Sequence, residues 1–148
     1  MSRAFVLAAA FITAAFMCTE VSADVVRADP RFYGVWRTPV DGGGLARLEP
    51  CGERICGYVV DSPWLRANPD QRDIRNSDPP LRGRRVVGLK FMEARALAEN
   101  RLGDGWVYHP EEGNTYTGTM TLLEDGRLRL TGCVLWPLCR TQIWRRVE

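Results

Sequence analysis

Residues 115–131, with the sequence TYTGTMTLLEDGRLRLT, decide the fold class. Threonine alternates with glycine or larger apolar residues as far as Leu122, and a Glu-Asp-Gly turn follows at 124–126. Leu128 and Leu130 then alternate with arginine. Successive side chains of a strand point to opposite faces, so this pattern indicates strands with one buried and one solvated face. The stretch therefore predicts a β-hairpin.

The same period of two recurs along most of the chain. Strand patterns also cover residues 32–37, 45–50, 55–61, 86–92, 106–109 and 140–147. Mostly short connections without βαβ units predict antiparallel pairing. Eight antiparallel strands can close into a barrel, which removes both sheet edges, whereas a sandwich would leave them. We predict an all-β fold, an antiparallel eight-stranded barrel in a single domain over 32–148, after a short lead-in at 24–31.

Two segments depart from the strand pattern. Residues 93–100 have a helix-forming composition and predict a short helix of two turns. Residues 62–85 are rich in proline, aspartate and arginine and show no periodicity. Long irregular segments inside compact domains are often functional, although a solvated loop held by Asp–Arg pairs is an alternative.

The first 23 residues predict a signal peptide. Arg3 supplies a positive start, an apolar run follows at 4–17, and Val21-Ser-Ala23 places small residues at the cleavage positions. The run is shorter than the ~20 residues that a membrane span needs, and Cys18 lacks the residues of a lipidation signal before it. We expect cleavage before Asp24, a periplasmic or secreted location, and no transmembrane segment in the mature chain.

Four cysteines follow that leader. Cys51 and Cys56 are close in sequence, and so are Cys133 and Cys139. An even number in a small exported domain predicts two disulfides, with three possible connectivities. Loop entropy favours a long-range pairing, whereas the geometry of hairpin ends favours Cys51–Cys56 and Cys133–Cys139, which we predict. Neither the spacing nor the single histidine suits a metal site.

The residues of common catalytic and nucleic-acid sites are missing. A net charge of +2 is too balanced for a nucleic-acid surface. No phosphate-binding glycine loop is present, and Ser62 and Ser77 have no spacing that ties them to His109. A carboxylate pair of Asp78 with Glu111 has no spacing support either. We expect no metal, no cofactor and a binding module rather than an enzyme.

A series of short motifs resembles one bacterial family. They are Gly34-Val-Trp36, Cys51, Ile55-Cys-Gly57, Asn76-Ser-Asp-Pro79, Leu81-Arg-Gly-Arg84, Gly88-Leu89, Trp106, Tyr108-His-Pro110, Gly113-Asn-Thr-Tyr116, Gly132-Cys133 and Cys139-Arg-Thr-Gln-Ile-Trp144. Together they resemble the secreted "domain of unknown function 2147" family, which implies no established activity.

The opening at Gly34-Val-Trp36 is also similar to that of the lipocalins and calycins. That resemblance implies a lipocalin-like barrel in which Trp36 plugs the closed end beneath Arg145 or Arg146 from the last strand.

An up-and-down barrel would bring distant polar residues to one rim. The loops at 39–44, 62–85, 110–114 and 134–138 would emerge together, because alternate connections share an end. The predicted ligand-binding residues there are Asn76, Asp78, Arg82, Arg84, His109, Trp136 and Arg140. Arginine forks suit a carboxylate or phosphate group; alternatively, Asp78 and the arginines only pin the long loop.

We therefore expect an exported envelope protein that binds an unidentified small or extended ligand, or an envelope component. A cavity lined by Trp106, Met120, Leu122, Leu128 and Leu130 could hold it, unless these side chains fill the barrel. The alternatives are a hydrolase acting on an envelope substrate and a structural or interaction protein of the cell envelope.

Overall fold

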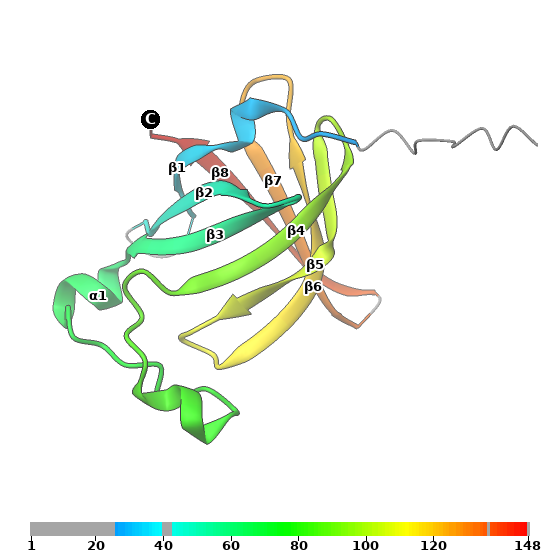
Figure 1. The fold of residues 1–148 in the computed structure, drawn as a ribbon. Coiled ribbons are helices and arrows are strands. Elements are labelled where there is room, and N and C mark those ends of the chain that lie inside the picture. Colours follow the sequence, from blue (N-terminus) through cyan, green and yellow to red (C-terminus); the bar gives the residue numbers. More distant parts are fainter. Residues whose placement is uncertain (1–25, 40–42, 136, 148) are drawn as a thin grey trace, which may run out of the picture.

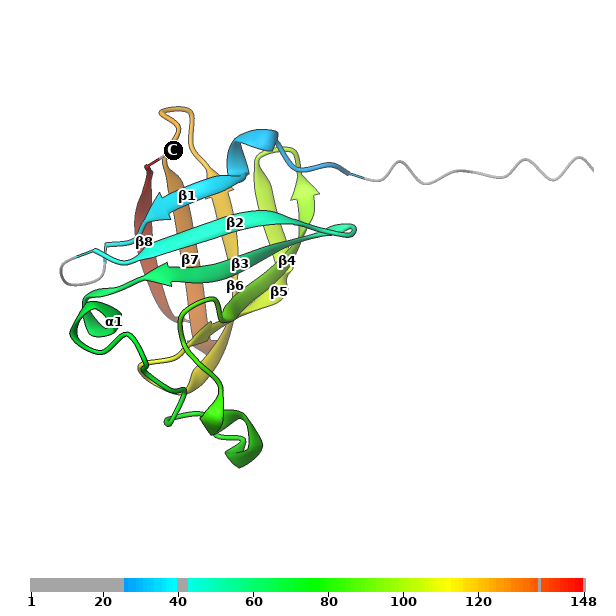
Figure 2. The ribbon, with the colours of Figure 1, turned by 60° about the vertical axis from the view of Figure 1, so that its left-hand side comes forward.

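Eight antiparallel strands form a closed barrel in the computed structural model, which describes residues 26–39, 43–135 and 137–147 (Figures 1 and 2). Each strand pairs with the next in sequence, and the last pairs with the first. The strands are β1 (Gly34–Arg37), β2 (Leu45–Cys51), β3 (Arg54–Asp61), β4 (Lys90–Ala98), β5 (Arg101–His109), β6 (Asn114–Leu122), β7 (Leu128–Leu135) and β8 (Leu138–Arg146). The predicted fold class is confirmed.

Three short helical segments accompany the barrel in the described residues: the 3-10 helices η1 (Pro30–Phe32) and η2 (Pro79–Gly83), and the α-helix α1 (Pro63–Ala67). The Ser62 side chain caps α1 by accepting a hydrogen bond from the Leu65 amide. None of the helices in these parts of the chain is long and apolar enough to cross a membrane.

One end of the barrel is sealed around Trp36. Helix η1 lies over this end (Figure 2), and both Phe32 and Trp36 are fully buried. The Trp36 indole donates to the Phe32 carbonyl at 2.9 Å, and the Arg146 guanidinium lies 5.3 Å from the Trp36 ring centre. Arg146 also donates to the carbonyls of Arg31 and Tyr33. The predicted plug therefore forms, with Arg146 rather than Arg145 stacked on the tryptophan.

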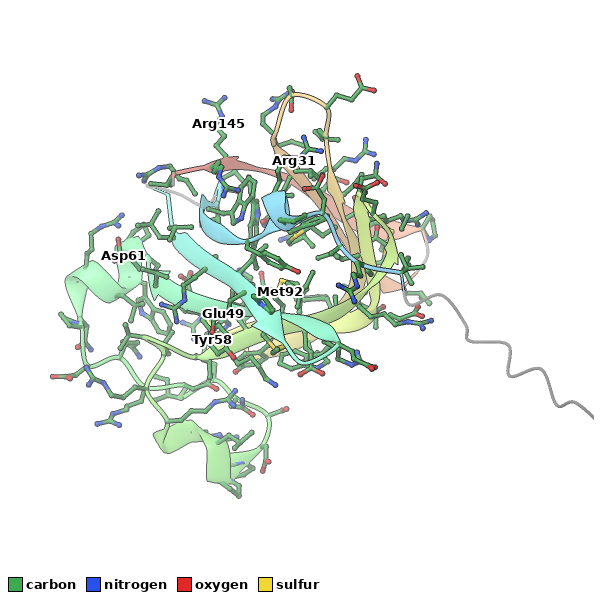
Figure 3. The ribbon with its side chains drawn as sticks, turned by 45° about the horizontal axis from the view of Figure 1, so that its top comes forward. Arg31, Glu49, Tyr58, Asp61, Met92 and Arg145 are labelled. Atoms are coloured by element: carbon green, nitrogen blue, oxygen red, sulfur yellow. A yellow bond between two sulfur atoms is a disulfide. The ribbon has the colours of Figure 1, made fainter. Side chains whose placement is uncertain are left out.

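Arg145, by contrast, points away from the barrel, whereas Met92 lies inside it (Figure 3). The interior near the sealed end is filled by large side chains, including Leu48, Met92, Leu102, Met120 and Leu128. Alternating inward residues of β6 and β7 supply part of this core, as the threonine-rich pattern predicts.

The predicted helix at 93–100 is wrong. Strand β4 runs through most of this segment and pairs with β3 and β5, so that Ala94 is buried in the core. Alanine and glutamate favour helices locally, but cross-strand hydrogen bonds and burial outweigh a propensity of a few tenths of a kcal/mol per residue. The strand predicted from residue 86 also begins later, at Lys90.

Both predicted disulfides are present. Cys51 pairs with Cys56 across the β2–β3 hairpin, and Cys133 pairs with Cys139 across the β7–β8 hairpin. Because successive connections alternate between the barrel ends, the two disulfides brace opposite ends.

Candidate ligand-binding cavity

The end of the barrel opposite η1 is hollow. It holds a cavity of about 550 Å³, within the ~300–1,000 Å³ range of small-molecule sites. Its walls are mainly apolar and come from most of the strands: Leu45, Ala46, Val59, Val86, Phe91, Val107, Leu130, Val134, Leu138 and Trp144 line it. Phe91 and Trp144 also belong to the packed core, with ring centres 6.1 Å apart. This aromatic pair therefore forms the boundary between the filled and hollow halves.

Small residues on the inner face keep this half open. Gly44, Ala46 and Gly132 line the cavity. A Cβ atom added to Gly132 would meet nothing closer than 3.9 Å, where the Tyr116 Cβ and the Thr117 carbonyl lie. The space beside Gly132 is therefore empty because this inward position of β7 has no side chain to fill it.

His109 contributes a polar side chain to the wall of this apolar space. It follows Val107 at a spacing of two on β5, and both side chains line the cavity. The His109 Nδ1 atom is buried without a hydrogen-bond partner among the described residues. A buried polar atom left unpaired costs about 1–3 kcal/mol, and this nitrogen is covered by protein rather than open to the cavity.

Charged and hydroxyl groups surround the mouth. The Tyr116 hydroxyl donates to the Glu112 carboxylate, and this bond raises the pKa of the Tyr116 phenol. Arg140 lies 3.8 Å from the same carboxylate. Asp61, at the end of β3, bonds Arg66 of α1, and its position at the α1 side of the barrel is visible in Figure 3. The polar groups thus gather at the rim, above the apolar walls.

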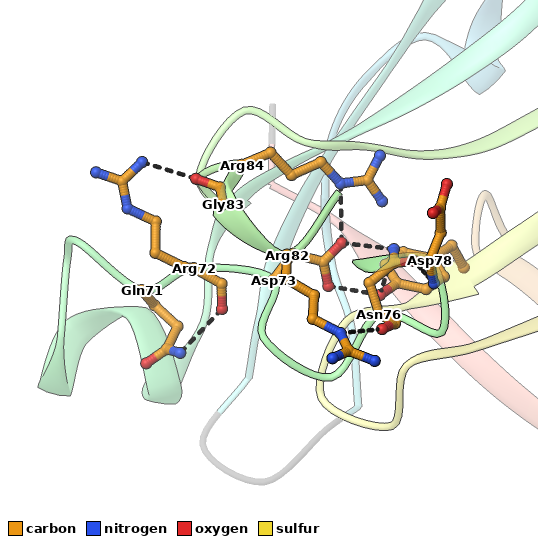
Figure 4. Close-up of polar contacts among 9 residues, drawn as sticks. Gln71, Arg72, Asp73, Asn76, Asp78, Arg82, Gly83 and Arg84 are labelled. Atoms are coloured by element: carbon orange, nitrogen blue, oxygen red, sulfur yellow. Dashed lines mark hydrogen bonds and ion pairs between the residues drawn. The ribbon is translucent and has the colours of Figure 1, made fainter. Parts of the chain in front are cut away.

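The long segment between β3 and β4 is anchored on a buried aspartate, Asp73 (Figure 4). The Asp73 carboxylate accepts hydrogen bonds from Asn76 Nδ2 and Arg84 Nε, each at 2.8 Å, and from the Tyr108 hydroxyl of β5. Asn76 Nδ2 also donates to the Tyr108 oxygen at 3.0 Å. Burial, and then the bond to Asp73, raise the pKa of Tyr108 to about 12. The cluster fastens the segment to a strand that lines the cavity.

Two further contacts fix the rest of the segment. Arg82 Nε donates to the Asn76 carbonyl at 2.8 Å, and the Asp78 amide donates to the Asn76 side-chain oxygen at 2.9 Å. Arg75 donates to the Glu111 carbonyl in the β5–β6 turn, where a Cβ at Gly113 would lie only 1.9 Å from the Arg75 carbonyl oxygen. A glycine at this turn therefore lets the segment approach closely.

The structure divides the predicted site residues into two groups. His109 and Arg140 line the cavity. The other described residues lie outside its lining and in the Asp73 network: Asn76, Asp78, Arg82 and Arg84. Trp136 lies outside the described residues. The carboxylate that holds Arg84 is Asp73 and not Asp78, so the residue at the centre of the network was missed.

The predicted lining was also largely misplaced along the barrel axis. Of the five apolar residues proposed, Leu130 lines the cavity, whereas Met120, Leu122 and Leu128 are packed in the core. Trp106 lies beside a much smaller gap and stacks under Lys90. Trp64, Phe91 and Tyr116 line the cavity instead. The strand alternation identified the inward residues of β6 and β7, but it carries no information on which end is filled.

Two arrangements are not formed among the described residues. Ser62 Oγ is used in the α1 cap, and His109 Nδ1 has no partner, so a serine–histidine pair is not formed through that atom. A grouping of three or more residues able to hold a metal is also missing from the described ranges.

A closed eight-stranded meander with one sealed end and one hollow end defines a lipocalin-like barrel. A solved structure described as protein HP1028 from the human pathogen Helicobacter pylori, belonging to the lipocalin family, superposes with a TM-score of 0.69. It is 19% identical, and the match covers 78% of this chain and 82% of that one. At 19% identity, this similarity shows that the two proteins share a fold.

The chain belongs to the DUF2147 family, described as an uncharacterized protein conserved in bacteria, whose model matches residues 34–146. The family resemblance of the motifs is thereby confirmed. A comparison with curated proteins gives no significant match.

Proposed function

We propose that the protein is a non-enzymatic binding module that takes a small ligand with an apolar body into the open half of the barrel. The observation that carries this proposal is the cavity of about 550 Å³ beneath a polar mouth. Transfer of apolar surface from water contributes about 25 cal/mol per Å², so an apolar molecule that covers these walls gains affinity from burial.

The polar mouth gives the ligand a second feature. Arg140 and the Tyr116 hydroxyl both contact the Glu112 carboxylate, and all three residues line the cavity. We therefore propose that the ligand carries a polar group that lies at the mouth beside these side chains while its apolar body is buried.

The proposed setting is the periplasm or the extracellular medium. Two disulfides suit an oxidising compartment, and the leader-like residues 1–23 supply a route for export. A role in the cell envelope belongs to this proposal.

The test compares two glycine substitutions with the probe N-phenyl-1-naphthylamine, whose fluorescence rises in apolar surroundings. Gly132→Phe places a ring in the cavity, whereas Gly83→Phe adds the same ring on the exposed η2 turn, where a Cβ meets nothing within 4 Å. We expect wild type and Gly83→Phe to bind the probe and Gly132→Phe to lose it.

Circular dichroism on each variant shows that the barrel is intact. Probe binding by folded Gly132→Phe equal to that of wild type would refute a site in the cavity. Native mass spectrometry of the wild-type protein would then identify any molecule that co-purifies with it.

A further inference from the structure

The tip of the β7–β8 hairpin exposes apolar side chains. Val134, Leu135 and Leu138 are 75%, 69% and 68% exposed, more than any other large hydrophobic residue in the described chain. The Cys133–Cys139 disulfide closes the hairpin directly behind them, and Leu135 pairs with Leu138 across it. The apolar side chains are therefore presented to solvent by a braced turn.

This tip is continuous with the cavity. Val134 and Leu138 line the cavity as well as being exposed, so an apolar surface runs from the inner wall to the outside of the mouth. A partner that binds the β7–β8 tip therefore also faces the mouth of the cavity. A ligand that leaves the cavity along this side meets apolar surface rather than water.

One segment at the same end of the barrel is positively charged, although Asp61, Glu111 and Glu112 also lie at the mouth. The segment between β3 and β4 emerges at the end that carries the β7–β8 tip (Figure 1). Residues 62–89 contain six arginines and three aspartates and are net +3, whereas the whole chain is +2. Arg72 and Arg75 are exposed there, and between them Ile74 is 59% exposed. Exposed apolar side chains and exposed arginines at one end of a protein suit the boundary of an anionic bilayer.

We propose that the open end of the barrel docks on an anionic lipid surface. Val134, Leu135 and Leu138 enter the boundary between head groups and acyl chains, and the exposed Arg72 and Arg75 lie over the phosphates. Docking does not require the proposed cavity ligand. With that ligand, which rests on the proposed function, docking joins the cavity mouth to the bilayer so that an apolar molecule passes between them.

A second copy of the chain suits this surface less well. Three side chains on one hairpin tip cover far less than the ~1,000 Å² that a stable interface needs. Two copies that met through this end would also bring together two segments of net charge +3. An anionic bilayer satisfies both the apolar tip and the positive charge.

The experiment is co-sedimentation of the full chain with vesicles of phosphatidylglycerol and phosphatidylethanolamine, and with vesicles of phosphatidylcholine. Leu135→Asp changes the tip at a residue outside the cavity lining. Val147→Asp makes the same charge change on an exposed residue at the opposite end. The N-terminus of each preparation is determined by mass, and only preparations with the same N-terminus are compared.

We expect wild type and Val147→Asp to bind the anionic vesicles more tightly than phosphatidylcholine. Leu135→Asp should bind them at least about tenfold more weakly, because it loses the burial of one leucine and adds a negative charge. Binding should also fall with added salt. All three proteins should bind N-phenyl-1-naphthylamine equally in solution, so a failure of docking is distinguishable from a failure of the cavity.

Equal sedimentation of Leu135→Asp and Val147→Asp, or no binding of wild type to anionic vesicles, would overturn the proposal. A wild-type dimer in analytical ultracentrifugation that Leu135→Asp abolishes would assign the tip to self-association instead.

Discussion

Replacing Asp73 with alanine should release the segment between β3 and β4 from the barrel. The Asp73 carboxylate has no exposed surface and accepts hydrogen bonds from Asn76, Arg84 and Tyr108. Alanine leaves these three donors without their acceptor. The Asp73–Tyr108 bond ties the segment to β5 together with the bond from Asn76 to Tyr108, so its loss affects the segment more than the strands.

The size of the effect follows from burial. Breaking one side of a buried charged network costs about 3–5 kcal/mol. Arg84 is itself about one-third exposed, so water can replace part of its bond, and we expect the lower half of that range. Asp73→Asn keeps the shape and one acceptor oxygen and should cost roughly 1–3 kcal/mol. Asp70→Ala is the control, because its pair with Arg85 is exposed and is worth under about 1 kcal/mol.

Two measurements distinguish local release of the segment from a loss of stability of the whole protein. Urea unfolding followed by circular dichroism gives the free energy of unfolding, and limited trypsin digestion reports cleavage after Arg72 and Arg75 in the native protein. Asp73→Ala should lower the free energy of unfolding, accelerate trypsin cleavage, or do both. Asp70→Ala should change neither quantity. An Asp73→Ala protein within about 1 kcal/mol of wild type, with unchanged cleavage, would refute the anchoring role.

Four further outcomes are expected. Trp36→Ala should cost about 3–5 kcal/mol of unfolding free energy, because it empties the sealed end; a loss below ~1 kcal/mol in a urea titration would contradict this plug. The raised pKa of Tyr108, about 12, stabilises the fold fully below the unfolded value near pH 10, and roughly 2–3 kcal/mol should be lost between pH 10 and 12. Alkaline unfolding of Tyr108→Phe should show a smaller loss over that interval. Replacing both Arg82 and Arg84 with glutamine should lower thermal stability and leave N-phenyl-1-naphthylamine binding unchanged; stability within ~0.5 kcal/mol of wild type with binding lost would make them ligand-binding residues. Terminal sequencing of the protein from the cell envelope should begin at Asp24, and a retained leader or a lipid on the preceding cysteine would exclude the predicted cleavage.

Much of the fold could be predicted from the sequence, because the patterns that indicate strands and disulfides involve residues close together in the chain. The alternation at 115–122 and 128–130 fixes which side chains face inward whatever else the chain does. The disulfides join cysteines at the two sides of one turn, so hairpin geometry was enough to choose them. Residues 93–100 show the limit, since their composition favours a helix and only pairing with β3 and β5 makes them a strand.

The candidate site could be predicted from the sequence only in part. Placing the loops at one end correctly brought His109 and Arg140 to the mouth. The alternative prediction was that Asp78 and the arginines pin the long loop. Asp73 holds Arg84 instead, and it meets Tyr108 across 35 residues of chain. No spacing pattern records a contact of that kind.

The sequence by itself determined the strand periods, the antiparallel meander and the disulfide pairs, because each depends on neighbours along the chain or across one hairpin. The tryptophan plug was implied only by the resemblance to lipocalins, since Trp36 and Arg146 lie on the first and last strands. Only the tertiary structure decided that the barrel is filled around Trp36 and hollow beside Gly132. Whether an interior is filled depends on the summed volumes of side chains that meet from all eight strands. The same closure placed the apolar β7–β8 tip and the arginine-rich segment at the open end, because alternate connections of an antiparallel barrel emerge together.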